Sequence, residues 1–242
     1  MVPRFLPAGD RALVVEFGSA IDIQINRQVV ALDHALCALE LDGVQECVPT
    51  YRSLLVIFDP LRITRDALVC RIQDLEVPED LEGSRRSRWV VPVLYGGSAG
   101  ADLDFVASTH GINSRTLIEL HSAADYWVHM IGFAPGFAYL GGLPEQLHTS
   151  RRAEPRARIP GRSISIGGSQ AAISPPVEMP SGWHLLGQTP LRSFDLTRRE
   201  DPFLFRAGDS VRFHPVSDAE YARLDEAAAA GVQVAARETA WS

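Results

Sequence analysis

The first 80 residues alternate between strand-like and helix-like patterns of apolar side chains. Three short apolar runs predict strands, at 12–17, 44–48 and 54–58. Over 22–41, apolar residues recur at steps of three and four, which predicts a helix closed by a left-handed cap at Gly43. Thr64 can cap a second helix that runs to about residue 75. This order, with room for one further strand, predicts a small split βαβ unit.

A polar segment over 78–88 interrupts this alternation. It combines Pro, Gly, Ser, acidic and Arg residues with little apolar surface to bury, which is typical of a domain boundary. We therefore expect one α/β domain over 1–84 and a second domain over 85–217. Residues 218–242 are expected to hold a C-terminal helix, begun by a capping box at Ser217, and a loose tail.

The second domain differs from the first in its expected helices and in its content of Gly and Pro. Two short helices are expected across 102–122, and their helix-turn-helix spacing raises the question of DNA binding. The second of them offers only Arg115 to read base edges, which argues against that function. Residues 132–190 then carry nine Gly and eight Pro in 59 residues, so long helices are excluded and a compact barrel of short strands is predicted.

The charged residues disfavour or exclude several classes of function. The 242 residues carry 23 basic and 30 acidic side chains, a net charge of −7, which disfavours nucleic-acid binding. All 23 basic residues are Arg, so the chain has no lysine for a Schiff base or for a P-loop. If the protein takes part in an ATP-dependent reaction, we expect another chain to hold the nucleotide.

The three cysteines, Cys37, Cys47 and Cys70, have no zinc-type spacing, and no metal site is expected. Cys37 and Cys70 fall in apolar helical stretches, where we expect buried thiols that act as small hydrophobes. The first nine residues lack the pattern of a signal peptide, and no apolar run approaches the length of a membrane helix. A reducing cytoplasm is therefore the expected compartment.

Two features near the Gly/Pro-rich region carry candidate chemistry. His129 lies in the predicted strand 126–131, from which it would point toward that region and could transfer protons. Four Arg side chains fall in eight residues of a Pro-stiffened loop, at 151, 152, 156 and 158. They would either meet a carboxylate or phosphate, or form surface ion pairs or a partner interface.

A third feature is the segment 132–140, GFAPGFAYL, in which Gly and Pro set the backbone between three aromatic rings. It is either a ligand wall or a corner of the core. The longer segment 130–140 resembles the signature of the KipI/PxpB family, the B subunits of 5-oxoprolinase, also called allophanate hydrolase subunit 1. Further matches follow in order, at 150–160, 163–166, 187–190 and 208–213. The resemblance extends over about 1–217.

The resemblance implies an α+β fold, with a small ferredoxin-like N-terminal domain followed by a cyclophilin-like β-barrel. It implies a subunit of an ATP-dependent 5-oxoprolinase that hydrolyses the lactam of 5-oxo-L-proline to L-glutamate. Two partners are implied, one PxpC/KipA-like (allophanate hydrolase subunit 2 type) and one PxpA/LamB-like. ATP and Mg²⁺ would be bound mainly by another subunit, with no cofactor held tightly by this chain. Two alternatives stay open: a urea carboxylase-related subunit acting on a ureide such as allophanate, and an inhibitor of a sensor histidine kinase.

With the resemblance, the candidate residues form an expected groove on the barrel. His129 and Arg156 are the candidate catalytic residues. The groove itself is expected to hold Phe133, Pro135, Gly136, Phe137, Tyr139, Arg151, Arg158, Ser163, Gln170 and Trp183. Arg162, Ser174 and Ser181 depart from the family pattern around this groove, which bears on substrate or partner choice.

Overall fold

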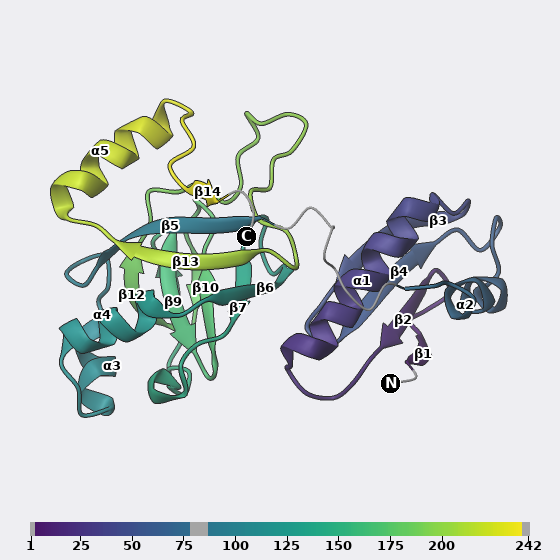
Figure 1. Cartoon of the computed structure of the whole chain (residues 1–242), viewed down its shortest axis with the longest axis horizontal. Helices are drawn as coiled ribbons and strands as arrows, with labels where there is room; N and C mark the ends of the chain where they lie inside the picture. Colours follow the sequence, from purple (N-terminus) through teal and green to yellow (C-terminus); the bar gives the residue numbers. More distant parts are fainter. Residues whose placement is uncertain (1–2, 78–86, 239–242) are drawn as a thin grey trace. The chain divides into compact units, whose positions relative to one another are not determined.

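The computed structural model describes residues 3–77 and 87–238. The chain divides into two compact units, residues 1–85 and 86–242 (Figure 1). The boundary predicted after residue 84 lies outside the described residues. The two units are described separately below.

The first unit is a four-stranded antiparallel sheet with two helices. Its strands are β1 (Arg4–Pro7), β2 (Ala12–Glu16), β3 (Val44–Pro49) and β4 (Ser53–Phe58), in the order β1-β2-β4-β3. The helices are α1 (Ile23–Leu39) and α2 (Arg65–Gln73). Because β2, α1 and β3 are consecutive and β4 lies between the two strands, the predicted split βαβ arrangement is confirmed.

Strand β1 was not predicted, and it changes how the sheet is completed. It pairs with β2 antiparallel, from Arg4 opposite Glu16 to Pro7 opposite Leu13. No strand follows α2 within residues 3–77, so the N-terminal strand occupies the edge expected for a strand after the second helix. Its four residues end in a proline, which is tolerated at a sheet edge but hides the strand pattern.

The two helices of the first unit have clear beginnings. The Asp22 side chain accepts hydrogen bonds from the backbone N–H groups of Gln24 and Ile25, and the Thr64 hydroxyl accepts one from Ala67. The residue that caps α1 in a left-handed conformation is Glu40, with φ of 44°, whereas Gly43 also has a positive φ, of 94°, but lies three residues beyond that cap. Both helices bury their apolar residues against the same face of the sheet, because α1, α2, β2 and β4 contribute to a single core.

The second unit is a closed barrel of seven strands. They are β5 (Arg88–Tyr95), β6 (Tyr126–Ile131), β7 (Ala138–Gly141), β9 (Ser163–Gly167), β10 (Gln170–Ile173), β12 (His184–Gln188) and β13 (Ser210–Pro215). The order is β12-β9-β10-β7-β6-β13-β5, and β12 pairs back with β5 to close the barrel. The predicted α+β fold with a C-terminal barrel is confirmed.

The edge of β5 opposite β13 is divided between two partners. Leu94 and Tyr95 pair with β12, whereas residues 88–90 pair with a short strand, β14 (Ala236–Glu238). Residues that were expected to form a tail therefore extend the sheet. The preceding helix α5 (Asp218–Ala229) begins at Ser217, whose hydroxyl accepts a hydrogen bond from the Glu220 N–H as the capping box predicts.

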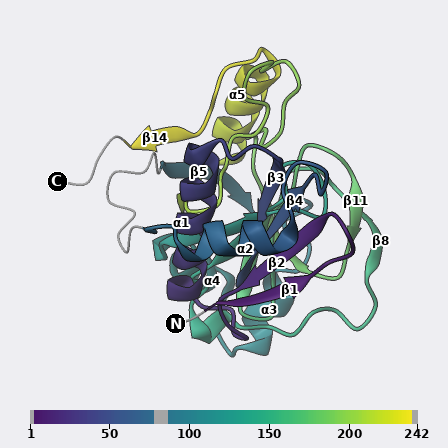
Figure 2. The same cartoon turned by 90° about the vertical axis from the view of Figure 1, so that its right-hand side faces the viewer.

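Short helices and a ribbon complete the second unit. Helices α3 (Leu103–Thr109) and α4 (Ser114–Ala123) are the two predicted short helices, and a 3₁₀ turn follows at Glu145–Leu147. Strands β8 (Arg156–Ile159) and β11 (Met179–Ser181) form a two-stranded ribbon of their own (Figure 2). In the described part of the chain, no helix is long and apolar enough to cross a membrane.

The ribbon creates a second apolar cluster in this unit. Alternate residues of β10 and β12, such as Ala171 and Leu186, fill the barrel interior. Their neighbours Ala172 and Leu185 face outward and pack with residues of the β8–β11 ribbon. The outer cluster is made of Phe137, Ile159, Ala172, Met179, Trp183 and Leu185. The aromatic residues of the 132–140 segment are thus placed on the outside of the barrel.

Candidate functional site

Four aromatic rings that the sequence analysis singled out meet at the outer cluster. The ring of Phe137 lies 4.7 Å from that of Tyr139 and 6.4 Å from that of Trp183, centroid to centroid. Tyr139 and Trp183 are 6.0 Å apart, and Phe133 stands edge-on to Phe137 at 5.8 Å. Edge-to-face contacts of this kind add about 0.5–1.5 kcal/mol per pair beyond the area they bury.

Phe133 differs from the other three rings in both exposure and backbone. Its side chain is 67% exposed, whereas Phe137 and Trp183 are buried. Its φ is +69°, and the Ala134 N–H donates to the Gly132 carbonyl at 2.8 Å, which makes Phe133 the central residue of a tight γ-turn. A left-handed conformation costs a residue other than glycine about 1–2 kcal/mol. The fold therefore accepts strain to hold an apolar ring in solvent.

The loop around Phe133 is closed by its own backbone. The Gly132 N–H donates to the Phe137 carbonyl at 3.1 Å, and the Phe137 N–H donates to Ala134 at 3.0 Å. Pro135 is exposed at the tip of the loop, while Gly136 is buried with no room for a side chain beside Phe194. These bonds fix the loop, so Phe133 is presented from a defined turn.

Arg151 lies at the rim of the rings. Its guanidinium carbon is 5.4 Å from the centroid of Trp183, within the range of a cation–π contact. The Trp183 ring packs directly on Gly167, where an added Cβ would come within 2.8 Å of it. Burial raises the pKa of Tyr139, and the nearby charge of Arg151 opposes that shift. We call Phe133, Phe137, Tyr139, Trp183 and Arg151 the aromatic site.

Arg152 and Arg156 are engaged elsewhere. Arg156 forms a two-pronged pair with Asp102, with N–O distances of 2.7 and 2.8 Å, and Arg152 reaches the same carboxylate at 3.1 Å. The backbone N–H of Leu185 also donates to it, at 2.8 Å. Both forks of Arg156 are used in this way, so it joins β8 to the start of α3 and β12. The sequence offered Arg156 as a guanidinium free to meet an anion. In the structure both of its terminal nitrogens are already bonded to Asp102.

The Asp102 carboxylate is held ionised despite its position. Its side chain is 6% exposed, and burial alone would raise its pKa. The hydrogen bonds from Arg156 and Leu185 and the charges of Arg156 and Arg152 outweigh burial, so the pKa of Asp102 lies below its ordinary value. Asp102 was missed because it stands at the N-cap position of α3 like many aspartates, and its partners Arg152 and Arg156 lie 50 and 54 residues further along the chain.

The remaining Arg of the predicted group is on the surface. Arg158 is exposed and its nearest carboxylate oxygen, on Glu178, is 3.8 Å away. The four-Arg cluster is therefore divided into one residue at the aromatic site, two on Asp102 and one in solvent.

His129 is buried, with 1% of its surface exposed. It lies at a bulge in β6, where its Nε2 occupies the space that a Cβ of Gly141 would need. The ring therefore packs on β7, which lies within the Gly/Pro-rich region as predicted, but it is enclosed in the barrel wall and does not face a groove. Its role in proton transfer stays a prediction.

Two further predicted groove residues are also buried. The Ser163 hydroxyl donates to the Pro160 carbonyl at 2.7 Å, and Gln170 begins β10. Neither presents its side chain to solvent, so the structure gives both a place in the barrel wall. Of the predicted groove, the exposed part is Phe133, Pro135, Arg151 and Arg158.

The prediction of buried thiols is wrong for Cys37 and Cys70, which are exposed. The apolar stripe of α1 follows Val29, Leu32 and Leu36, and Cys37 comes one residue after that stripe, about 100° around the helix. Cys47 is half-buried. The thiols of Cys37 and Cys47 lie near one another, an arrangement that no spacing in the sequence predicts.

Comparison with known proteins shows which family the chain belongs to. Residues 3–205 match the family model described as "Carboxyltransferase domain, subdomain C and D". The B subunit of 5-oxoprolinase from Escherichia coli O157:H7 is 41% identical over 209 residues, covering 86% of this chain and 93% of that protein. The chain belongs to the family of 5-oxoprolinase B subunits.

A second named B subunit and a solved structure are also similar to this chain. The B subunit of 5-oxoprolinase from Bacillus subtilis (strain 168) is 34% identical, covering 88% of this chain and 92% of its own length. The crystal structure of TTHA0988 superimposes with a TM-score of 0.77 at 33% identity, over 86% of this chain. The chain spans about 40% of that solved protein.

The aromatic site does not fit a nucleotide with Mg²⁺. Its five residues include no carboxylate, the ligand that Mg²⁺ prefers, and its one cation already lies on Trp183. The chain also has no lysine to reach a phosphate. No step through ATP is therefore assigned to this site.

Proposed function

We propose that this chain is the B subunit of an ATP-dependent 5-oxoprolinase. In that role it hydrolyses 5-oxo-L-proline to L-glutamate together with a PxpC/KipA-like and a PxpA/LamB-like subunit. The support is the identity of 41% and 34% to two proteins named as 5-oxoprolinase B subunits, over more than nine-tenths of their length. ATP and Mg²⁺ belong to a partner in this proposal, and the complex acts in the cytoplasm.

The aromatic site is the contact through which the chain works in the complex. The observation that carries this is Phe133, an apolar ring kept in solvent by a strained γ-turn. Strain of this kind persists where the surroundings over-determine it and is concentrated at functional sites. An exposed aromatic ring above a buried aromatic cluster also has the composition of an interface hot spot. Phe133 therefore anchors a partner subunit.

Arg151 completes this role. It is the only member of the aromatic site with a charge, and it is exposed while its guanidinium carbon lies 5.4 Å from the centroid of the Trp183 ring. The outward edge is free to meet a carboxylate, either on the partner or on 5-oxoproline. Arg156, one catalytic candidate from the sequence, has a positioning role at Asp102, and proton transfer by His129, the other, stays a prediction.

The test is reconstitution of the three subunits with ATP, Mg²⁺ and 5-oxoproline, followed by glutamate release. Glutamate formation is expected only with all three chains. Phe133→Ala is expected to weaken assembly by about 30-fold, on the scale of a 2 kcal/mol hot spot. Phe105→Ala is the matched control, because Phe105 is also an exposed phenylalanine but lies on α3.

Other outcomes would redirect the proposal. A stable complex that releases nothing from 5-oxoproline but cleaves allophanate would support a ureide substrate. A chain that forms no complex, but binds a sensor kinase alone, would support the inhibitor alternative.

A second pair of variants tests Arg151. Arg151→Ala is expected to raise the KM for 5-oxoproline or the Kd for the partner by about tenfold, whereas Arg115→Ala, on the exposed face of α4, should change neither. Equal effects of the two substitutions would remove Arg151 from the site.

A further inference from the structure

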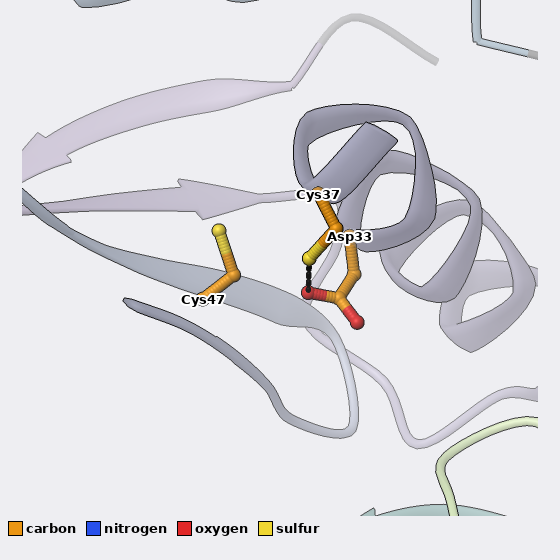
Figure 3. A group of neighbouring side chains, drawn as sticks. All are labelled: Asp33, Cys37 and Cys47. Carbon is orange, nitrogen blue, oxygen red and sulfur yellow. Dashed lines mark hydrogen bonds between the residues drawn. The ribbon is translucent and has the colours of Figure 1, made fainter. Parts of the chain in front are cut away.

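Three side chains with metal-binding atoms meet between α1 and β3 in the first unit (Figure 3). Asp33 and Cys37 come from α1 and Cys47 from β3. One carboxylate oxygen and the two sulfur atoms all lie within 4.8 Å of one another, and the Cys37 thiol donates to Asp33 Oδ1 at 3.9 Å. This group, the α1–β3 cluster, lies outside the aromatic site and is not used by the function proposed above.

We propose that the α1–β3 cluster binds one Zn²⁺ ion through the thiolates of Cys37 and Cys47 and the carboxylate of Asp33. A water molecule would take the fourth position of the tetrahedron. Both thiols lose their protons to solvent when the ion binds, and no electron is transferred.

The spacing of the atoms is close to what this coordination needs. With Zn–S of about 2.3 Å and Zn–O of about 2.1 Å, tetrahedral angles put the two sulfurs about 3.8 Å apart and each sulfur about 3.6 Å from the oxygen. The distance from Cys37 Sγ to Asp33 Oδ1 is 3.9 Å, and no pair exceeds 4.8 Å. Side-chain rotations that move each ligand atom by less than about 1 Å would therefore complete the site.

The backbone holds the three residues in place. Asp33 and Cys37 are four residues apart on α1, so both point from the same face of the helix. Cys47 lies in β3, which packs along that helix within the first unit. Two ligands at a helical i, i+4 spacing and a third from a neighbouring strand make a site that exists before the ion arrives.

The ligand types select the metal. Mg²⁺ and Ca²⁺ take oxygen ligands, and two of the three ligands here are sulfur. Two thiolates and one carboxylate suit Zn²⁺, which accepts both and prefers four-coordinate geometry. The position is also accessible, because Cys37 is exposed and Cys47 half-buried.

The three groups of the α1–β3 cluster all have raised pKa values. Burial raises the pKa of Asp33 to about 6, and burial together with the charge of Asp33 raises the pKa of Cys47 to about 12. The other groups that act on Cys47 are Cys37 and Glu46, and both raise its pKa further. Zn²⁺ would displace the protons of both thiols and offset two of the three negative charges that the ligands then carry.

The test is metal binding by the full chain, stripped with a chelator and kept in a phosphine reductant so that every cysteine stays a thiol. Calorimetric titration with Zn²⁺ is expected to give one equivalent. Co²⁺ should add the thiolate-to-metal absorption of a two-sulfur site. Cys37→Ser and Cys47→Ser should each weaken Zn²⁺ binding by at least about 100-fold, because even outer-shell partners are worth about 10–100-fold.

Cys70→Ser is the matched control, because Cys70 is exposed and lies outside the cluster. It should bind Zn²⁺ as the unmodified chain does. Asp33→Asn should weaken binding while keeping the two-sulfur absorption of Co²⁺, which separates loss of the oxygen ligand from misfolding.

Alkylation of the unmodified chain tests the same metal site without any substitution. With Zn²⁺ present, iodoacetamide is expected to modify Cys70 and to spare Cys37 and Cys47. Binding weaker than millimolar, equal binding by Cys37→Ser and the unmodified chain, or protection of all three cysteines alike would overturn the proposal. Thiols that bind no Zn²⁺ but pair as a Cys37–Cys47 disulfide when the reductant is replaced by oxidised glutathione would also overturn it, in favour of a redox pair.

Discussion

Phe133 shows how one residue separates stability from function. Its positive φ makes the chain less stable than a glycine would at that position, and its exposed ring returns little by packing. The ring makes an edge-on approach to Phe137 and otherwise stays largely in solvent. The residue is therefore explained by what its ring does for a partner, and much less by what it does for the fold.

The strain at Phe133 predicts an unusual ranking of variants. Phe133→Gly should be more stable than Phe133→Ala by about 1 kcal/mol, because both lose the ring but only glycine adopts the left-handed turn without cost. Urea denaturation of the two variants measures the difference directly. An alanine variant as stable as the glycine variant would mean that the γ-turn relaxes when the ring is removed.

His121 is a buried titratable residue of the barrel unit whose pKa differs between the folded and the unfolded chain. It is fully buried, stacks on Phe213 with centroids 4.7 Å apart, and bonds the Tyr95 hydroxyl through Nδ1 at 2.8 Å. Burial lowers its pKa from 6.5 to about 3. The folded chain thus keeps this ring neutral, whereas the unfolded chain takes up a proton as the pH falls below 6.5.

Stability should accordingly decrease as the pH falls from about 6.5 toward 3. Between pH 7.5 and 5.5, linkage to His121 alone removes about 1.4 kcal/mol of the free energy of unfolding. His121→Gln should lose that much less than the unmodified chain over the same interval, measured by urea denaturation at each pH. His214→Gln, at an exposed position, is the control and should follow the unmodified chain. Parallel pH profiles for His121→Gln and the unmodified chain would show that the ring is not buried as a neutral group.

At the residue level, the sequence was informative where neighbours along the chain are also neighbours in space. Phe133, Phe137 and Tyr139 fall within seven residues, and their clustering was predicted. Asp102 lies 54 residues from Arg156, and Cys47 comes from a different element than Asp33. Such pairs depend on how elements pack, which a single sequence does not specify. The burial of His129 depends on a bulge and on Gly141, which periodicity also does not show.

Among elements, the β8–β11 ribbon is held to the barrel unit by charge as well as by apolar packing. Arg156 begins β8, and its bidentate bond to Asp102 connects the ribbon to α3 and, through Leu185, to β12. Removing one partner of a buried pair leaves the other without compensation. The aromatic site rests on the same ribbon and strand, so this pair also supports its shape.

Arg156→Ala is expected to destabilise the chain by about 2 kcal/mol, less than for a fully buried pair because Arg152 still reaches Asp102. Arg158→Ala, which removes an exposed arginine two positions along, should cost no more than about 0.5 kcal/mol. Both are measured by urea denaturation followed by tryptophan fluorescence. An Arg156→Ala chain of normal stability that has lost activity in the reconstituted complex would restore Arg156 as a substrate-binding residue.

The order of elements in the first unit was largely predictable, whereas β7, β8, β11 and β12 of the second unit were covered only by the general expectation of a barrel of short strands. The two short edge strands were missed for one shared reason. Strands β1 and β14 have four and three residues, respectively, and each lies at the edge of its sheet. Edge strands this short have too few alternating positions to produce a pattern. Their existence follows from an unpaired edge of β2 or β5, which only the assembled sheet presents.

At the scale of the whole chain, each unit has its own hydrophobic core. The tryptophans that serve as fluorescence probes are unevenly distributed between the two units. The first unit has no tryptophan among residues 3–77, whereas Trp89, Trp127 and Trp183 all lie in the described part of the second unit. The core of the first unit is built from aliphatic residues and phenylalanine. Tryptophan fluorescence therefore reports on the barrel unit alone.

Leu36→Ala should destabilise the first unit by about 2–5 kcal/mol, because Leu36 is fully enclosed in its core. Hydrogen exchange is expected to show loss of protection in α1 and β2. The urea midpoint from tryptophan fluorescence should stay where it is. A midpoint that moves together with the loss of protection would show that the two cores unfold as one cooperative system.

The pairing of β14 with β5 has a consequence for how the barrel unit can be connected. Arg88, at the start of β5, lies opposite Glu238, the last residue described, so the unit's incoming and outgoing chains emerge side by side. A body whose two ends are adjacent can be spliced into a loop of another polypeptide, or have its ends joined and be reopened elsewhere, without stretching its strands. The position of its two chain ends therefore suits the barrel unit to insertion into another polypeptide as a complete domain.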